Sequence, residues 1–222
     1  GDSALGTNIF RTALLREGKR LTDVARQMSS ALGIRHTILP MSDDSVRTVL
    51  DTDQGRLAFQ EYFVRERWQP QVHAVHFEGA AEAQPSAEVL QAIDEASLIV
   101  FGPSNPVLSI DPILALPGLR ERIRASSAPC VAVSPIIGGQ AVKGPAAKLM
   151  AELGIDVSPV GVATHYIDLL YGIILDDVDM HLCDVVSRMN LHCIARRTLM
   201  DSLVDKIALS EHLLKWAEEV FS

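Results

Sequence analysis

The sequence predicts an α/β protein with a Rossmann-like, doubly wound, mainly parallel sheet and a β-hairpin-containing insertion. From about residue 85 onward, short apolar runs alternate with amphipathic stretches, the order that right-handed βαβ crossovers produce. Residues 97–101 form a nearly unbroken apolar run, as expected where helices cover both faces of a parallel sheet. A chain of 222 residues that is 48% apolar can bury one well-packed core. We therefore expect a single α/β domain over residues 1–222.

The first forty residues predict two helices and a strand. The helices are expected at residues 7–18 and 21–32. In the second helix, apolar residues recur at helical spacing, and Gly33 supplies a C-terminal stop. Residues 34–39 predict a short strand that follows this stop.

Residues 40–80 predict a β-rich, partly antiparallel subregion. A hairpin is expected, with strands at residues 46–50 and 57–64 on either side of the turn at residues 53–55. The second of these strands is predicted because its side chains alternate with a period of two. Residues 72–77 predict another strand.

The remaining residues predict the parallel sheet and its helices. A helix opens at Pro85 and Ser86, and the amphipathic residues 202–221 predict the last helix. Further strands are expected at residues 130–134, 172–175 and 192–195, and further helices at residues 119–125 and from Pro145 onward.

Charge and hydropathy exclude several classes of partner. The net charge of −8 and the pI near 5.3 leave no basic footprint for nucleic acid. A phosphorylated small ligand is still possible, because it needs only a local cluster of donors. No apolar stretch approaches the roughly 20 residues of a membrane span, so we expect no membrane partner.

The cysteines and the first residues bear on where the protein works. Cys130, Cys183 and Cys193 are odd in number and lack CxxC spacing, which favours a reducing cytoplasm over a disulfide framework or a zinc site. The chain starts without Met and runs directly into patterned sequence. We therefore expect that an upstream segment is missing.

Two loops that follow apolar strands carry the strongest signals for a ligand, because parallel sheets bind ligands at the carboxyl ends of their strands. In the first loop, Gly102 allows close approach of the backbone, Ser104 and Asn105 offer donors, and Pro106 stiffens the turn. These are the components of a phosphate cradle. The same residues also build a rigid strand-to-helix turn for purely local reasons, and composition alone does not decide between the two readings.

The second loop follows residues 130–134 and contains a cation. Ser134 and Gly138 precede Lys143 and Gly144, just before the helix predicted from Pro145. A pair of glycines followed by a lysine suits a diphosphate, although this is not a Walker motif. Two such loops after neighbouring strands favour ligand binding.

A third polar cluster lies at residues 42–47. Asp43 and Asp44 could hold Mg²⁺ or accept hydrogen bonds from the base or sugar of a ligand, Ser42 could bind substrate, and Arg47 could bind phosphate. The alternative is a solvated Asx turn whose acids Arg47 neutralises. The acids at residues 176–179 lack the pattern of an EF-hand loop, and we interpret them as a helix N-terminus.

Taken together, these stretches resemble the CofD-type 2-phospho-L-lactate transferase family. The matching stretches occur in order over nearly the whole chain. They are residues 11–18 (RTALLREG), 38–44 (ILPMSDD), 46–48 (VRT), 59–65 (FQEYFVR), 77–79 (FEG), 102–107 (GPSNPV), 112–113 (PI), 117–118 (PG), 133–138 (VSPIIG), 143–146 (KGPA) and 198–200 (TLM).

The resemblance implies an enzyme of coenzyme F-420 biosynthesis. Such an enzyme transfers a phospholactyl, phosphoenolpyruvyl or phosphoglyceryl group from a guanosine diphosphate donor to the ribityl hydroxyl of the deazaflavin Fo, with release of GMP. It further implies Mg²⁺ dependence, a Rossmann-like core and a homodimer. On this basis Ser104, Asn105 and Lys143 are expected to contact phosphate or nucleotide, and Asp43 or Asp44 to bind the metal or act as the base.

The sequence departs from the family pattern near its start. The family has a GGxG phosphate loop, which does not occur in this chain, and a GDRDLATH-like motif, which aligns with residues 1–8. Thr7 and Arg11 match and are expected to bind substrate, whereas Ser3 replaces an arginine that is expected to face Fo. These departures leave two alternatives open: a non-catalytic regulator that binds a nucleotide or sugar nucleotide, and a fragment without activity of its own.

Overall fold

Four parallel strands form the centre of the protein in the computed structural model, which describes residues 2–221. They lie in the order β4-β5-β8-β9 and in parallel register. Every residue of the two central strands is buried. The predicted α/β fold and parallel sheet are confirmed. The strands are β4 (Ile99–Phe101), β5 (Cys130–Val133), β8 (Gly172–Leu175) and β9 (His192–Ala195).

Helices cover both faces of this sheet, as the unbroken apolar strands predict. Cys130 and Ile173 face one core cluster, which includes residues of α6, α7 and α8, while Val131 and Ile174 face a second cluster built by α9. Burial of side chains of this size contributes roughly 1.5–3 kcal/mol each. The helices of this part are α3 (Ala87–Asp94), α4 (Asp111–Leu114), α5 (Leu119–Ala125), α6 (Ala146–Glu152), α7 (Pro159–His165), α8 (Cys183–Ser187) and α9 (Leu203–Phe221).

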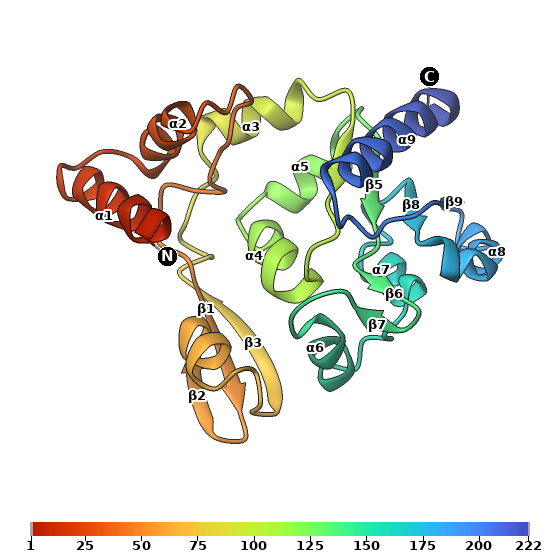
Figure 1. Ribbon diagram of the computed structural model, residues 1–222, viewed down its shortest axis with the longest axis horizontal. Coiled ribbons are helices and arrows are strands. Elements are labelled where there is room, and N and C mark those ends of the chain that lie inside the picture. Colours follow the sequence, from red (N-terminus) through yellow and green to blue (C-terminus); the bar gives the residue numbers. More distant parts are fainter. Residues whose placement is uncertain (1, 222) are drawn as a thin grey trace.

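A separate antiparallel sheet confirms the predicted β-hairpin-containing insertion. Its strand order is β2-β1-β3, and β1 pairs with both neighbours. Figure 1 shows it as the orange sheet below α1. Leu50, Tyr62 and Val72 of this region share a core cluster with Leu149 of α6, which joins the two sheets. The strands are β1 (Arg47–Thr52), β2 (Gly55–Ala58) and β3 (Val72–Glu78).

The prediction of a strand over residues 57–64 is wrong beyond Ala58. The strand β2 ends there, and Glu61–Arg65 forms a π-helical turn. The alternation of side chains with a period of two led to this wrong prediction, because the same residues also show a helical spacing of four. The rings of Phe59 and Phe63 lie 5.3 Å apart, and Arg65 pairs with Glu61 at 3.0 Å.

The N-terminal helices are confirmed as α1 (Asp2–Arg16) and α2 (Leu21–Ala31). The strand predicted at residues 34–39 is wrong, because no neighbouring strand in the described part of the chain supplies hydrogen-bond partners for it. Ile34 and Ile38 instead border an apolar groove beside α2. Within residues 2–221, no helix combines the length and apolar character that crossing a bilayer requires.

Candidate functional site

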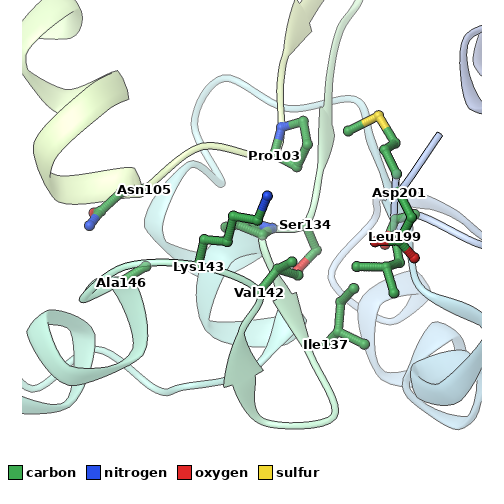
Figure 2. Close-up of a pocket in the computed structure, with 12 residues that line it drawn as sticks. Pro103, Asn105, Ser134, Ile137, Val142, Lys143, Ala146, Leu199 and Asp201 are labelled. Atoms are coloured by element: carbon green, nitrogen blue, oxygen red, sulfur yellow. The ribbon is translucent and has the colours of Figure 1, made fainter. Parts of the chain in front are cut away.

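The carboxyl ends of the parallel strands share one edge of the sheet, and the loops that leave β4, β5 and β9 surround a pocket there (Figure 2). Its volume is about 200 Å³. Pockets that hold a whole ligand commonly measure roughly 300–1,000 Å³. This pocket therefore suits a phosphate with an adjoining sugar or ring, and not two complete substrates. The lining residues are Pro103, Asn105, Ser134, Pro135, Ile137, Val142, Lys143, Ala146, Thr198, Leu199, Met200 and Asp201.

The first wall is the loop after β4. Asn105 caps the π-helical turn Pro106–Ile110, because its side-chain oxygen accepts hydrogen bonds from the N–H groups of Val107 and Leu108 at 3.0 and 3.2 Å. Figure 2 shows the Asn105 side chain directed away from the middle of the pocket. The loop therefore acts as the rigid turn that composition also allowed, and it still borders the pocket through Pro103 and Asn105.

The second wall is a small hairpin, β6 (Ile136–Ile137) and β7 (Gln140–Ala141). Gly138 and Gly139 form its two-residue turn with φ of +56° and +74°, which glycine adopts without steric cost. The N–H of Gly138 donates to Asp179 at 2.9 Å and is not available to a phosphate. The Ser134 hydroxyl likewise bonds to the backbone of Ile136. The glycine pair thus serves hairpin geometry.

Lys143 follows this hairpin and carries the positive charge of the pocket lining. Its side chain is exposed, and no described carboxylate in residues 2–221 lies within ion-pair distance of it. Figure 2 shows its amino group directed into the space beside Pro103. The neighbouring Gly144 has φ of +68° and lies against the ring of Phe63, so the antiparallel region supports this loop. An unpaired cation facing a pocket is suited to an anionic ligand.

The third wall, residues 198–201 after β9, was not predicted as part of a site. The buried Asp176 holds it, since its carboxylate accepts from the Thr198 N–H at 2.8 Å and from the Thr198 hydroxyl at 3.1 Å. Burial raises the pKa of Asp176, but these donors and the Val178 N–H lower it by more, so that the pKa lies below its ordinary value. The position of this loop at the carboxyl end of a parallel strand was the signal that could have found it.

The structure brings only some of the predicted residues to the pocket. Asn105, Ser134 and Lys143 line it. Gly102, Ser104, Pro106, Gly138 and Gly144 lie in the same two loops without lining it. The predicted residues that lie elsewhere are Thr7 and Arg11 on α1, and Ser42, Asp43, Asp44 and Arg47 between α2 and β1.

Asp43 and Asp44 are committed to internal hydrogen bonds. Asp43 accepts from the Thr22 N–H at 2.7 Å and from Arg20 at 2.9 Å, while Asp44 accepts from the Gln84 N–H at 2.9 Å. Burial raises the pKa of Asp43, but Thr22 and Arg20 lower it by more, and the net shift is downward. Among residues 6–221, whose side chains the structure describes, no three His, Cys, Asp or Glu side chains are grouped as metal ligands would be. The metal role of Asp43 and Asp44 stays a prediction.

Comparison with known proteins decides the family. Residues 1–206 match the family described as 2-phospho-L-lactate transferase CofD. The chain belongs to this family. The 2-phospho-L-lactate transferase of Methanosarcina mazei is 42% identical over 211 residues, which cover 95% of this chain and 69% of the relative. The phosphoenolpyruvate transferase of Streptomyces griseus is 38% identical over 225 residues, which cover 99% of this chain and 71% of the relative.

Solved structures support the fold of this CofD family member. A Bacillus halodurans protein of the UPF0052 family superposes with a TM-score of 0.61 at 16% identity, covering 93% of this chain and 70% of that one. Another crystal structure of that protein gives a TM-score of 0.65 at 17% identity, covering 93% and 71%. The predicted family and the predicted transferase class are confirmed.

Proposed function

We propose that this CofD family member transfers a phospholactyl, phosphoenolpyruvyl or phosphoglyceryl group from a guanosine diphosphate donor to the ribityl hydroxyl of Fo, with release of GMP. The observation that carries the proposal is the match to the transferase family over residues 1–206. Relatives bear the names 2-phospho-L-lactate transferase and phosphoenolpyruvate transferase, so both donor acids belong in the test.

The pocket has the electrostatics that this transfer needs. Attack of a hydroxyl at phosphorus builds negative charge on the phosphoryl oxygens and on the leaving phosphate, so catalysis depends mainly on positioning and charge stabilisation. Among the described side chains Lys143 has no ion-pair partner, and the fixed walls around it are suited to both tasks. The Lys143 amino group is therefore proposed to bind the diphosphate of the donor.

Mg²⁺ dependence is part of the proposal, but Asp43 and Asp44 fit it poorly. Three of their oxygen atoms accept N–H donors, and neither residue lines the pocket. Asp201 is the carboxylate among the pocket-lining residues. Mg²⁺ commonly takes one or two carboxylates together with substrate phosphates, so Asp201 fits such a role when the ion is bound.

The proposal is tested with the protein as its gene encodes it. It is incubated with Fo, Mg²⁺ and each of the three donors, and the mass of the deazaflavin is followed. We expect a phosphodiester product and one GMP per turnover with at least one donor. Absence of product with all three donors would contradict the proposal.

A non-catalytic nucleotide-binding regulator is the competing proposal, motivated by Ser3 and Asn8 in the motif at the start of the chain. Titration calorimetry with GDP and with a UDP-sugar separates the two. Tight binding without turnover would support the regulator. The homodimer is also a proposal, which light scattering of the purified protein tests.

A further inference from the structure

The segment after β8 carries two buried carboxylates that have no assigned role in the proposed reaction. Asp176 is 6% exposed and Asp179 is 3% exposed, whereas Asp177 between them is exposed. In the sheet, β8 lies between β5 and β9, the strands whose following loops form the second and third walls of the pocket. The two acids therefore lie between these walls.

Asp176 connects the segment to the third wall. One oxygen of its carboxylate accepts from both the N–H and the hydroxyl of Thr198, at 2.8 and 3.1 Å. The other oxygen accepts from the Val178 N–H at 3.3 Å, which caps the 3-10 helix Asp177–Leu182 as the sequence predicted. Helix capping accounts only for the bond from the Val178 N–H. The two bonds from Thr198 join residues that lie 22 positions apart in the sequence.

Asp179 connects the same segment to the second wall. Its carboxylate accepts from the Gly138 N–H at 2.9 Å, across 41 positions of sequence. The Asp179 N–H donates to the Asp176 carbonyl at 2.9 Å, so a backbone hydrogen bond also joins the two acids. Val178, between them, lies 3.9 Å from the point where a Cβ on Gly138 would be.

Burying a carboxylate at a purely structural position costs free energy. A buried charge without a partner is strongly unfavourable, and hydrogen bonds to a charged group are stronger than those between neutral groups. In residues 2–221, no Lys, Arg or His side chain lies within ion-pair distance of Asp176 or Asp179. The N–H and hydroxyl donors of the two walls therefore stabilise these charges, and displacing either wall leaves a carboxylate poorly satisfied.

We propose that Asp176 and Asp179 are positioning residues that together fix the distance between the Gly138 hairpin and the Thr198 loop, and thereby the width of the donor pocket. The role of the pocket as the donor site rests on the proposed function. The connection of the two walls does not, because the hydrogen bonds exist without any ligand.

Asp176→Asn and Asp179→Asn test this inference, since both preserve side-chain size and remove the charge. Asp177→Asn is the matched control on an exposed neighbour. Amide hydrogen exchange without ligand is expected to be about 10- to 100-fold faster at Thr198 in Asp176→Asn and at Gly138 in Asp179→Asn, each without a comparable change at the other site. Exchange equal to that of Asp177→Asn at both amides would overturn the connection.

Kinetics test the positioning role. We expect the KM for the donor to rise at least about 5-fold in both variants, with kcat within about 3-fold of the parent enzyme, because a widened pocket weakens binding more than it alters chemistry. A donor KM equal to that of Asp177→Asn, despite faster exchange, would overturn the positioning role. If the parent protein makes no product, the proposed function fails. The exchange rates at Thr198 and Gly138 still test whether the two acids connect the walls.

A milder variant covers the case in which Asp176→Asn fails to fold. Thr198→Val preserves the side-chain shape and the N–H donor but removes the hydroxyl that bonds to Asp176. We expect a smaller rise in exchange at residues 198–201 and a donor KM raised about 2- to 5-fold. Exchange and KM identical to those of the parent would contradict the inference.

Discussion

Two polar clusters of the sequence were candidates for a site, and the structure gives them different surroundings. One is the pocket at the carboxyl edge of the parallel sheet, and the other is the corner formed by residues 42–44. In the corner, the carboxylates of Asp43 and Asp44 accept hydrogen bonds from neighbouring segments. In the pocket, Lys143 faces an open space, and no carboxylate of the described part of the chain pairs with it. A polar group marks a site when the fold leaves it unsatisfied beside a cavity, and its residue type alone does not.

The largest expected effect tests the pocket side of this comparison. Lys143→Met should lower kcat/KM about 10²- to 10³-fold, because it removes a fixed positive charge where phosphate charge develops. Steady-state kinetics with the preferred donor measure it. Lys215→Met, on the exposed face of α9, is the matched control and should leave kcat/KM unchanged. Activity within about 3-fold of the parent in Lys143→Met would remove Lys143 from the site.

Substitution of two glycines with positive φ compares the packing of the two regions. A Cβ on Gly79 would lie 2.5 Å from the Ser45 carbonyl oxygen beside the corner, whereas on Gly144 the nearest atom within 4 Å is a Phe63 carbon at 3.9 Å. We expect Gly79→Ala to lower the free energy of unfolding by about 3 kcal/mol and Gly144→Ala by about 1 kcal/mol. Urea denaturation of both variants measures this. Equal losses would show that the corner is not the more tightly packed region.

The corner itself is tested through Asp43. Asp43→Ala should lower the free energy of unfolding by about 1 kcal/mol, because the Thr22 N–H at the start of α2 loses its acceptor. The value of kcat/KM and the Mg²⁺ dependence should stay unchanged. Asp23→Ala, on the same helix, is the control for loss of an acidic residue. Loss of Mg²⁺ activation in Asp43→Ala alone would make the corner part of the catalytic site after all.

The smallest expected effect is a pH dependence through Asp176. Its pKa in the folded protein is lowered, so its contribution to stability is present above the unfolded pKa of about 3.9 and is lost as the pH falls through the folded value. The difference in unfolding free energy between the parent and Asp176→Asn should stay constant from about pH 7 to 5 and shrink below about pH 4. Thermal denaturation across this range measures it, and a difference that grows toward acid would contradict the account.

The sequence predicts those elements whose local pattern agrees with their tertiary surroundings. The strands β5 and β8 are apolar along their whole length and buried on both faces, so each is readable from its own residues. Residues 57–64 fail because both helical and strand spacings occur in them. Residues 34–39 fail because a strand requires a neighbour, which a local pattern does not contain.

The residues of the site also differ in how far the sequence predicts them. Lys143 is predictable because glycine, proline and a cation follow a buried strand. The roles of Asp43 and Asp176 are not, because their partners lie 21 and 22 positions away and only the fold brings them together. The Thr198 loop was missed for a related reason. The strand before it, β9, is only partly buried and gives a weak apolar signal.

A crystal structure of the protein with GDP would show whether the pocket at Lys143 binds the donor diphosphate. We expect the diphosphate in the pocket between Pro103, Ser134 and the Thr198 loop, within hydrogen-bond distance of the Lys143 amino group. A diphosphate bound at Arg47 beside Asp43 and Asp44, with the pocket at Lys143 unchanged, would contradict it.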